Sequence, residues 1–342
     1  MFVITVLLMT AAPILLNNAS QINSMLGIET QIGQGAVEGN LYYNTKFKNM
    51  AEVKQASIDI IEEAEAEGAV LLKNEDVGGK PALPINKDEK VTLYGAASYY
   101  SVHTGQGSGG VEGGALNDRV TLYDGLTEAG LTVNSELNDW YKSNGGSSSV
   151  LGTDGSTFIG ASKQTTQFIV KDIAWNEVGA AKNNETDVAI MVLGRSSGEA
   201  LDLYMDVTMK GGQDDGLNVV LGRSGSGKYT TSYGDSGELA DNEADVLRNL
   251  KAMKDAGTIS KIVVLMNTAN PMQCAFIDDA DYGIDAAMWI GNMGTSGASA
   301  VGKLLAGEYN PSGRTVNTFW RNSAYNPVYY NFGSIGYGNS GI

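Results

Sequence analysis

Short apolar runs that end near Gly, Asn or Ser recur along this chain and alternate with segments of helical spacing. The runs cover residues 70–72, 91–94, 188–193, 262–266 and 286–290. Runs this apolar are typical of strands that are buried on both faces of a parallel sheet. Helices are predicted at residues 51–67, 120–129, 135–142, 239–256 and 296–306. The alternation predicts an α/β fold: a doubly wound, mostly parallel sandwich of about six strands, with helices on both faces.

The alternation also predicts the domain organisation. Residues 1–40 form an apolar N-terminal segment and linker, residues 41–320 form one α/β domain, and residues 321–342 form an irregular tail. The first helix is amphipathic and ends at Gly68, with Val53, Ala56, Ile60 and Ala64 at helical spacing. Residues 143–168 and 207–237 are rich in Gly, Ser, Thr and Asp. Their polarity predicts two surface insertions.

Composition excludes several classes of function. The chain carries 23 Lys and Arg against 39 Asp and Glu, a net charge of −16, so it should repel nucleic acids and anionic membranes. Cys274 and His103 are the only residues of their kinds, which excludes an internal disulfide and a His- or Cys-cluster metal site. We expect no cofactor. Cys274 is predicted to pack as a small buried apolar residue, and His103 to be a surface or packing residue, with a place in a sugar site as the alternative.

Residues 2–16 form an uncharged, largely apolar run. A membrane span needs about 20 residues, so this run is short for spanning. It has the length of a signal-peptide core, but no basic residue precedes it and the cleavage site is poor. We expect contact with copies of the same chain to bury the run, and such head-to-tail contacts generate rings or open filaments.

Three motifs follow one another along the chain. EGAVLLKNE (67–75), with LPI at 83–85, precedes VLGRSSGEALD (192–202), and GEYNPSGRT (307–315) follows. In this order and roughly this spacing they resemble the carboxy-terminal α/β domain of glycoside hydrolase family 3, the β-glucosidase type. The resemblance runs from about residue 41 to about residue 320. Some members of the family with reversed domain order start with a membrane anchor, and residues 2–16 resemble such an anchor cut short.

The resemblance implies a site. Retaining glycosidases use two carboxyl groups, one as nucleophile and one as general acid/base. The family's acid/base glutamate matches Glu199, and Asp202 is expected as a second polar group on the same rim. His103 and Trp289 are further substrate-binding candidates. The family carries its nucleophile on a separate barrel domain, and no segment of this chain resembles that barrel.

The sequence departs from the family near each motif. Ala200 stands where glycine is common, and Leu203 follows Asp202 where arginine is common. No carboxylate follows Trp289 in residues 289–297, and Asn317 replaces an aspartate. These changes indicate relaxed demand for catalysis, so a solvated loop carboxylate is the competing interpretation of Glu199.

Two glycine-rich stretches imitate nucleotide-binding loops. GRSGSGKY (222–229) has Tyr229 where a phosphate-binding loop needs Ser or Thr for magnesium, and no helix pattern follows to bind phosphate. Gly105, Gly107 and Gly110 have dinucleotide-loop spacing but precede no helix. We interpret the first as a hairpin in an insertion and the second as a loop near a domain interface.

Two functions remain open. In the first, the chain is an extracellular or cell-surface module that supplies Glu199 to a barrel on a downstream segment or partner chain, with glycans as ligands. In the second, it is an inactive structural subunit that assembles into filaments through residues 2–16. In both, the chain alone is not a complete glycosidase.

Overall fold

The computed structural model describes residues 46–105, 119–144, 168–169, 186–196, 242–269, 271 and 274–321. The apolar run at 2–16, most of both predicted insertions, the stretch 222–229 and residues 106–110 lie outside this part. The chain divides into two units, Met1–Ile60 and Ile61–Ile342. Helix α3 (Met50–Gly68) crosses the division. At its start the side chain of Asn49 accepts a hydrogen bond from the Glu52 amide at 2.9 Å, which satisfies one of the free N–H groups of the first turn.

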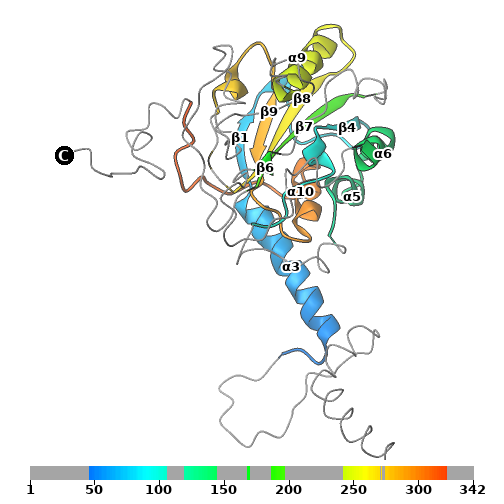
Figure 1. Cartoon of the computed structure of the whole chain (residues 1–342), viewed down its shortest axis with the longest axis vertical. Coiled ribbons are helices and arrows are strands. Elements are labelled where there is room, and N and C mark those ends of the chain that lie inside the picture. The colour runs from blue at the N-terminus through cyan, green and yellow to red at the C-terminus, as the bar shows by residue number, and fades with distance from the viewer. Residues whose placement is uncertain are drawn as a thin grey trace, which may run out of the picture. The chain divides into compact units, whose positions relative to one another are not determined.

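A mostly parallel sheet forms the centre of the second unit (Figure 1). Six strands lie in the order β1 (Val70–Asn74), β9 (Ala286–Trp289), β8 (Lys261–Thr268), β7 (Val188–Ser196), β4 (Lys90–Tyr94) and β5 (Thr132–Val133). The two-residue strand β6 (Phe168–Ile169) pairs with the end of β7. Strands β4, β5, β7, β8 and β9 are parallel. The predicted α/β fold with a mostly parallel sheet is confirmed.

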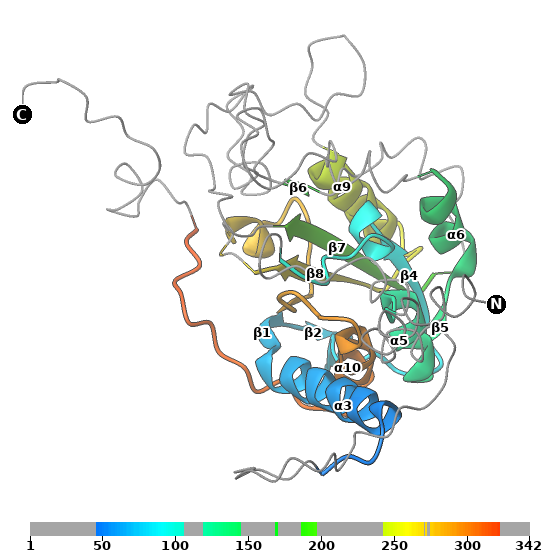
Figure 2. The same cartoon turned by 60° about the horizontal axis from the view of Figure 1, so that its bottom comes forward.

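Helices cover both faces of this sheet. The predicted helical segments appear as α5 (Leu122–Glu128), α6 (Ser135–Asn144), α9 (Asn242–Asp255) and α10 (Gly297–Leu305). Figure 2 shows α5 and α10 together on one side of the sheet and α9 on the other. Short elements that the sequence did not indicate fill the connections: the hairpin β2 (Asp76–Val77) and β3 (Lys80–Pro81), and the 3-10 helices η1 (Ala96–Ser98) and η3 (Ala275–Asp278).

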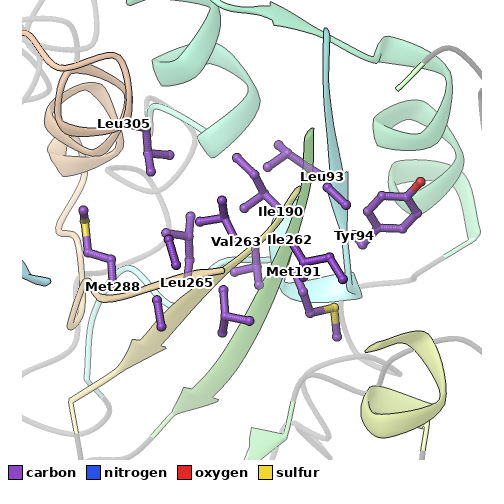
Figure 3. Packing of buried hydrophobic residues seen from close by; sticks show 14 of the residues in the cluster. Leu93, Tyr94, Ile190, Met191, Ile262, Val263, Leu265, Met288 and Leu305 are labelled. Carbon is purple, nitrogen blue, oxygen red and sulfur yellow. The ribbon is translucent and has the colours of Figure 1, made fainter. Parts of the chain in front are cut away.

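The core lies between the sheet and its helices. Every residue of β8 is buried, as expected for a strand with helices on both faces. Figure 3 shows Leu93, Ile190 and Val263 along one face of the sheet, with Leu305 of α10 above them. Full burial of each such side chain stabilises the fold by about 1.5–3 kcal/mol. The central strands therefore hold the domain together.

Two local predictions need correction. The run at 70–72 was predicted as a strand buried on both faces, but β1 is an antiparallel edge strand in which only Val70 is buried. The predicted apolar face of α3 is wrong in its second half, where Ile60 is 64% exposed and Ala64 is also exposed. There Ile61 and Glu65 are half-buried instead, because Ile61 lies against Gly294 and Glu65 against Gly297.

No helix in the described part of the chain has both the length and the hydropathy to cross a bilayer. The predicted anchor at residues 2–16 lies outside that part.

Helices α5 and α10 pack closely against each other at two glycine residues. A Cβ added to Gly302 would lie 2.0 Å from the carbonyl oxygen of Gly125, and a Cβ added to Gly125 would lie 2.1 Å from that of Ala298. Both distances are far shorter than van der Waals contact, and each obstacle is backbone. The contact between the two helices therefore requires glycine at both positions.

We predict that Gly302→Ala lowers the free energy of unfolding by about 1–3 kcal/mol, because the added methyl group forces the helices apart. Gly68→Ala is the matched control. A Cβ there meets nothing within 4 Å, so alanine should be neutral or stabilise the helix by up to about 1 kcal/mol. Urea denaturation of both variants measures the difference, and equal midpoints would contradict the close packing.

Candidate functional site

The amino-terminal edge of the parallel strands is closed by ion pairs. Lys261 begins β8, and its Nζ lies 3.0 Å from Glu89 Oε2, with the lysine side chain 6% exposed. Asp285, just before β9, accepts from Lys254 Nζ at 2.5 Å and from the Ile262 amide at 2.8 Å. Charges paired in this way lock strand ends together. The charged groups at this edge therefore stabilise the fold.

The carboxyl-terminal edge is different. In open α/β sheets, ligands gather outside this edge. Strand β8 ends with Asn267 and Thr268, β9 ends with Trp289, and the segment after η1 carries His103. Two buried polar atoms here have no hydrogen-bond partner among the described residues: His103 Nε2 and Asn292 Oδ1. Buried polar atoms are nearly always paired, so exceptions mark candidate sites.

His103 is buried and not at the surface, with 6% of its area exposed. Its Nδ1 lies 2.8 Å from the carbonyl oxygen of Gly294. Because a carbonyl only accepts, Nδ1 carries the proton and Nε2 the lone pair. Burial lowers the pKa of His103, the hydrogen bond to Gly294 opposes this shift and the charge of Arg119 adds to it, so that the pKa is about 4. The imidazole is therefore neutral at pH 7.

Trp289 lies at the same edge and is half-buried. Its Nε1 donates to the carbonyl oxygen of Thr268 at 2.6 Å, which ties the end of β9 to the end of β8. Its ring meets Phe319 edge-on at 6.3 Å between centroids. The structure thus brings Trp289 and His103 to one edge, through the segment 289–294 that joins them. Their predicted contact with a sugar stays a prediction.

Glu199 and Asp202 lie outside the described residues. Strand β7 ends at Ser196, three positions before Glu199 in the sequence. Register pairs place Gly194 opposite Asn267 and Arg195 opposite Thr268. β7 therefore ends at the carboxyl edge of the sheet. The position of the Glu199 side chain itself stays a prediction.

Cys274 is partly buried and packs against the core. Burial and, to a smaller extent, the charge of Asp278 together raise the pKa of its thiol to about 12. A thiol in this state is protonated at pH 7 and a poor nucleophile.

Sequence reasoning missed Glu65. In the acidic series of residues 62–67 it resembles a solvated position, but in the structure its Oε1 is buried without a hydrogen-bond partner among the described residues. Burial raises the pKa of Glu65 to about 8. The side chain lies against the start of α10, where a Cβ on Gly297 would lie 3.2 Å from both Cβ and Cγ of Glu65. A helix period alone gives no sign of this contact.

Comparison with known proteins assigns the family. The sequence matches the model of the glycosyl hydrolase family 3 C-terminal domain over residues 69–340. The chain belongs to this family. A beta-glucosidase from Ruminococcus albus is 27% identical over 259 residues, which cover 75% of this chain and 22% of that protein. Beta-glucosidase A from Butyrivibrio fibrisolvens is 25% identical over 265 residues, covering 78% and 29%.

Solved structures agree with the fold of this family 3 domain. A beta-glucosidase from Paenibacillus barengoltzii superposes with a TM-score of 0.59 at 26% identity, over 81% of this chain and 26% of that one. Beta-glucosidase 3B from Thermotoga neapolitana, in complex with glucose, gives 0.55 at 23% identity, over 81% and 32%. The family 3 domain thus spans between 22% and 32% of the length of these relatives.

We predict that the free energy of unfolding of the chain falls as pH rises because Glu65 is buried, and that Glu65→Gln removes this part of the pH dependence. The pKa of Glu65 is about 8 in the folded chain against 4.5 for the free group, so the folded state holds a proton that the unfolded state releases. Its stabilising contribution is complete below pH 4.5 and falls as pH rises to about 8. We expect the variant to gain about 1–3 kcal/mol over the parent at pH 8, on the scale of one unpaired buried polar group.

Glu63→Gln is the control, since Glu63 lies on the same helix and is exposed. Urea unfolding at pH 5 and pH 8 gives the comparison. If both variants show the same pH dependence as the parent, the burial of Glu65 has no energetic consequence.

Proposed function

We propose that this family 3 domain is the α/β module of a β-glucosidase-type site, in which Glu199 acts as general acid/base beside a barrel that supplies the nucleophile. The observation that carries the proposal is the course of β7. This buried strand ends at Ser196, and the SGE motif follows at residues 197–199. Relatives named beta-glucosidases, at 25–27% identity, support the substrate class.

The chemistry proposed for Glu199 has two steps. In a retaining glycosidase the acid/base carboxyl protonates the leaving oxygen while the nucleophile attacks the anomeric carbon. The same carboxylate then takes a proton from the water that releases the sugar. The two carboxyl groups must lie about 5 Å apart, so Glu199 needs its partner on a facing surface.

The other candidates border this edge. Trp289 is half-buried and offers part of an apolar ring to a sugar. His103 is neutral at pH 7, because its pKa is about 4, and adds no charge there. Asp202, three positions after Glu199 in the sequence, is proposed as a second polar group on the rim.

We predict that the purified chain alone does not turn over an aryl β-glucoside. General acid catalysis supplies about 10²–10⁴-fold, and a retaining mechanism also needs the second carboxyl group. Turnover that Glu199→Gln abolishes would contradict this division of labour.

A domain exchange tests the role of Glu199 directly. The chain replaces the matching domain of the Paenibacillus barengoltzii enzyme, and the exchanged enzyme is assayed with 2,4-dinitrophenyl and methyl β-glucosides. Glu199→Gln should slow the methyl substrate by about 10²–10⁴-fold, because its leaving group needs a proton. The dinitrophenyl substrate should be slowed much less. Equal effects on both substrates, or the same effect from Glu63→Gln, would remove Glu199 from the mechanism.

A second candidate function rests on residues 2–16. Leaving this uncharged run in water costs about 1.5–3 kcal/mol for each large side chain. We propose that the chain is an extracellular or cell-surface subunit that buries the run against another copy, with rings or filaments as products.

Deletion of residues 1–20 tests this second function. Light scattering after size-exclusion chromatography should find assemblies for the full chain and monomers for the truncated one. The same oligomeric state for both would remove self-assembly through this run.

A further inference from the structure

Every hydrogen-bonding group of the Asn267 side chain has a partner within the protein. It is the last residue but one of β8 and is 0% exposed. Its Oδ1 accepts from the Val102 amide at 2.5 Å, and its Nδ2 donates to the carbonyl oxygens of Val102 at 2.9 Å and Gly291 at 2.7 Å. Both N–H groups and the oxygen are therefore engaged.

These bonds join two segments that are neither helix nor strand. Val102 follows η1, and Gly291 follows β9. A buried backbone segment outside a sheet must find partners for its N–H and C=O groups. Asn267 satisfies both groups of Val102, as a neighbouring strand would, and one group of Gly291.

A second pair of bonds joins the same two segments directly. The Gly294 amide donates to the carbonyl oxygen of His103 at 2.8 Å, and His103 Nδ1 donates to the carbonyl oxygen of Gly294 at 2.8 Å. Gly291 and Gly294 have φ of +53° and +63°, a left-handed conformation that glycine adopts without strain. The segments after η1 and β9 are thus linked to each other by His103 and to β8 by Asn267.

This linkage lies beside the strand that leads to Glu199. Asn267 is paired in register with Gly194 of β7, and Thr268 with Arg195. Thr268 also accepts the hydrogen bond from Trp289. The end of β7 therefore lies next to the residue that joins both segments.

We propose that Asn267 is the positioning residue of the carboxyl-edge site, holding the His103 segment and the Trp289 segment together at the end of β8, the strand next to β7. The proposal rests on the proposed function only in placing the site at this edge. Asn267 does not itself contact the reacting atoms. It acts through the two segments that it holds.

The experiment follows His103, the only histidine in the chain, by NMR in the full-length protein. Asn267→Ala should release the two segments and admit water to the imidazole. The pKa of His103 should then rise from about 4 toward 6.5. Hydrogen exchange of the Gly294 amide, which does not bond to Asn267, should become at least about tenfold faster, as in a local opening. Amides in the middle of β7 and β8 should keep their protection.

Asn74→Ala is the matched control. Asn74, at the other edge of the sheet, makes the same two-way pairing with a backbone: its Oδ1 accepts from the Leu83 amide at 2.9 Å, and its Nδ2 donates to the Leu83 carbonyl at 3.0 Å. Its loss should leave the pKa of His103 and the exchange of Gly294 unchanged. Should Asn267→Ala fail to fold, Asn267→Ser, which keeps a hydroxyl near the same place, is used for the same measurements.

A folded Asn267 variant with the pKa of His103 still near 4 and with Gly294 still protected would overturn the proposal. The same shift in Asn74→Ala would also overturn it, because the effect would then be general loss of stability. None of these readouts involves turnover. Failure of Glu199→Gln to affect the domain exchange would remove the acid/base role and leave the positioning role intact.

Discussion

Strands β7 and β8 are shielded from water by protein on both faces, and the rest of the domain depends on this burial. Side chains on either face are apolar because helices cover each side of the sheet, as α10 does above Ile190 and Val263. Polar groups are then confined to the two ends of the strands, where the chain enters and leaves the sheet. The division into two chemically different edges follows from this confinement.

Different kinds of side chain connect the strand ends at the two edges of the sheet. At the amino edge, lysines pair with carboxylates, as the buried Lys261 does with Glu89. Such pairs hold strand starts but leave no capacity for a ligand. At the carboxyl edge, a neutral amide, Asn267, and a neutral imidazole, His103, make the connections. Uncharged connections avoid the desolvation cost of buried ions.

Particular residues show how far the sequence could predict the structure. The apolar runs in β7 and β8 predicted buried parallel strands, because no other element needs so uniform a pattern. The direction of β1 relative to the other strands was not predictable from its apolar residues. Helix α3 leads into β1 at the carboxyl edge of the sheet, so β1 runs antiparallel to β9. Glu65 was missed for a related reason. Its burial depends on Gly297, which is remote in sequence.

The sequence by itself determined the fold class, the family and the segment that carries the candidate acid/base Glu199, because strand and helix periods and short motifs are local properties of a chain. Only the tertiary structure decided that Asn267 joins Val102 to Gly291 and that His103 is buried and neutral at pH 7, with a pKa of about 4. The bonds from Val102 to Asn267 and from His103 to Gly294 join residues that are 165 and 191 positions apart. The local sequence pattern does not indicate such contacts. Burial sets both the protonation state and the hydrogen-bond partners of a polar side chain, and burial exists only after the chain has folded.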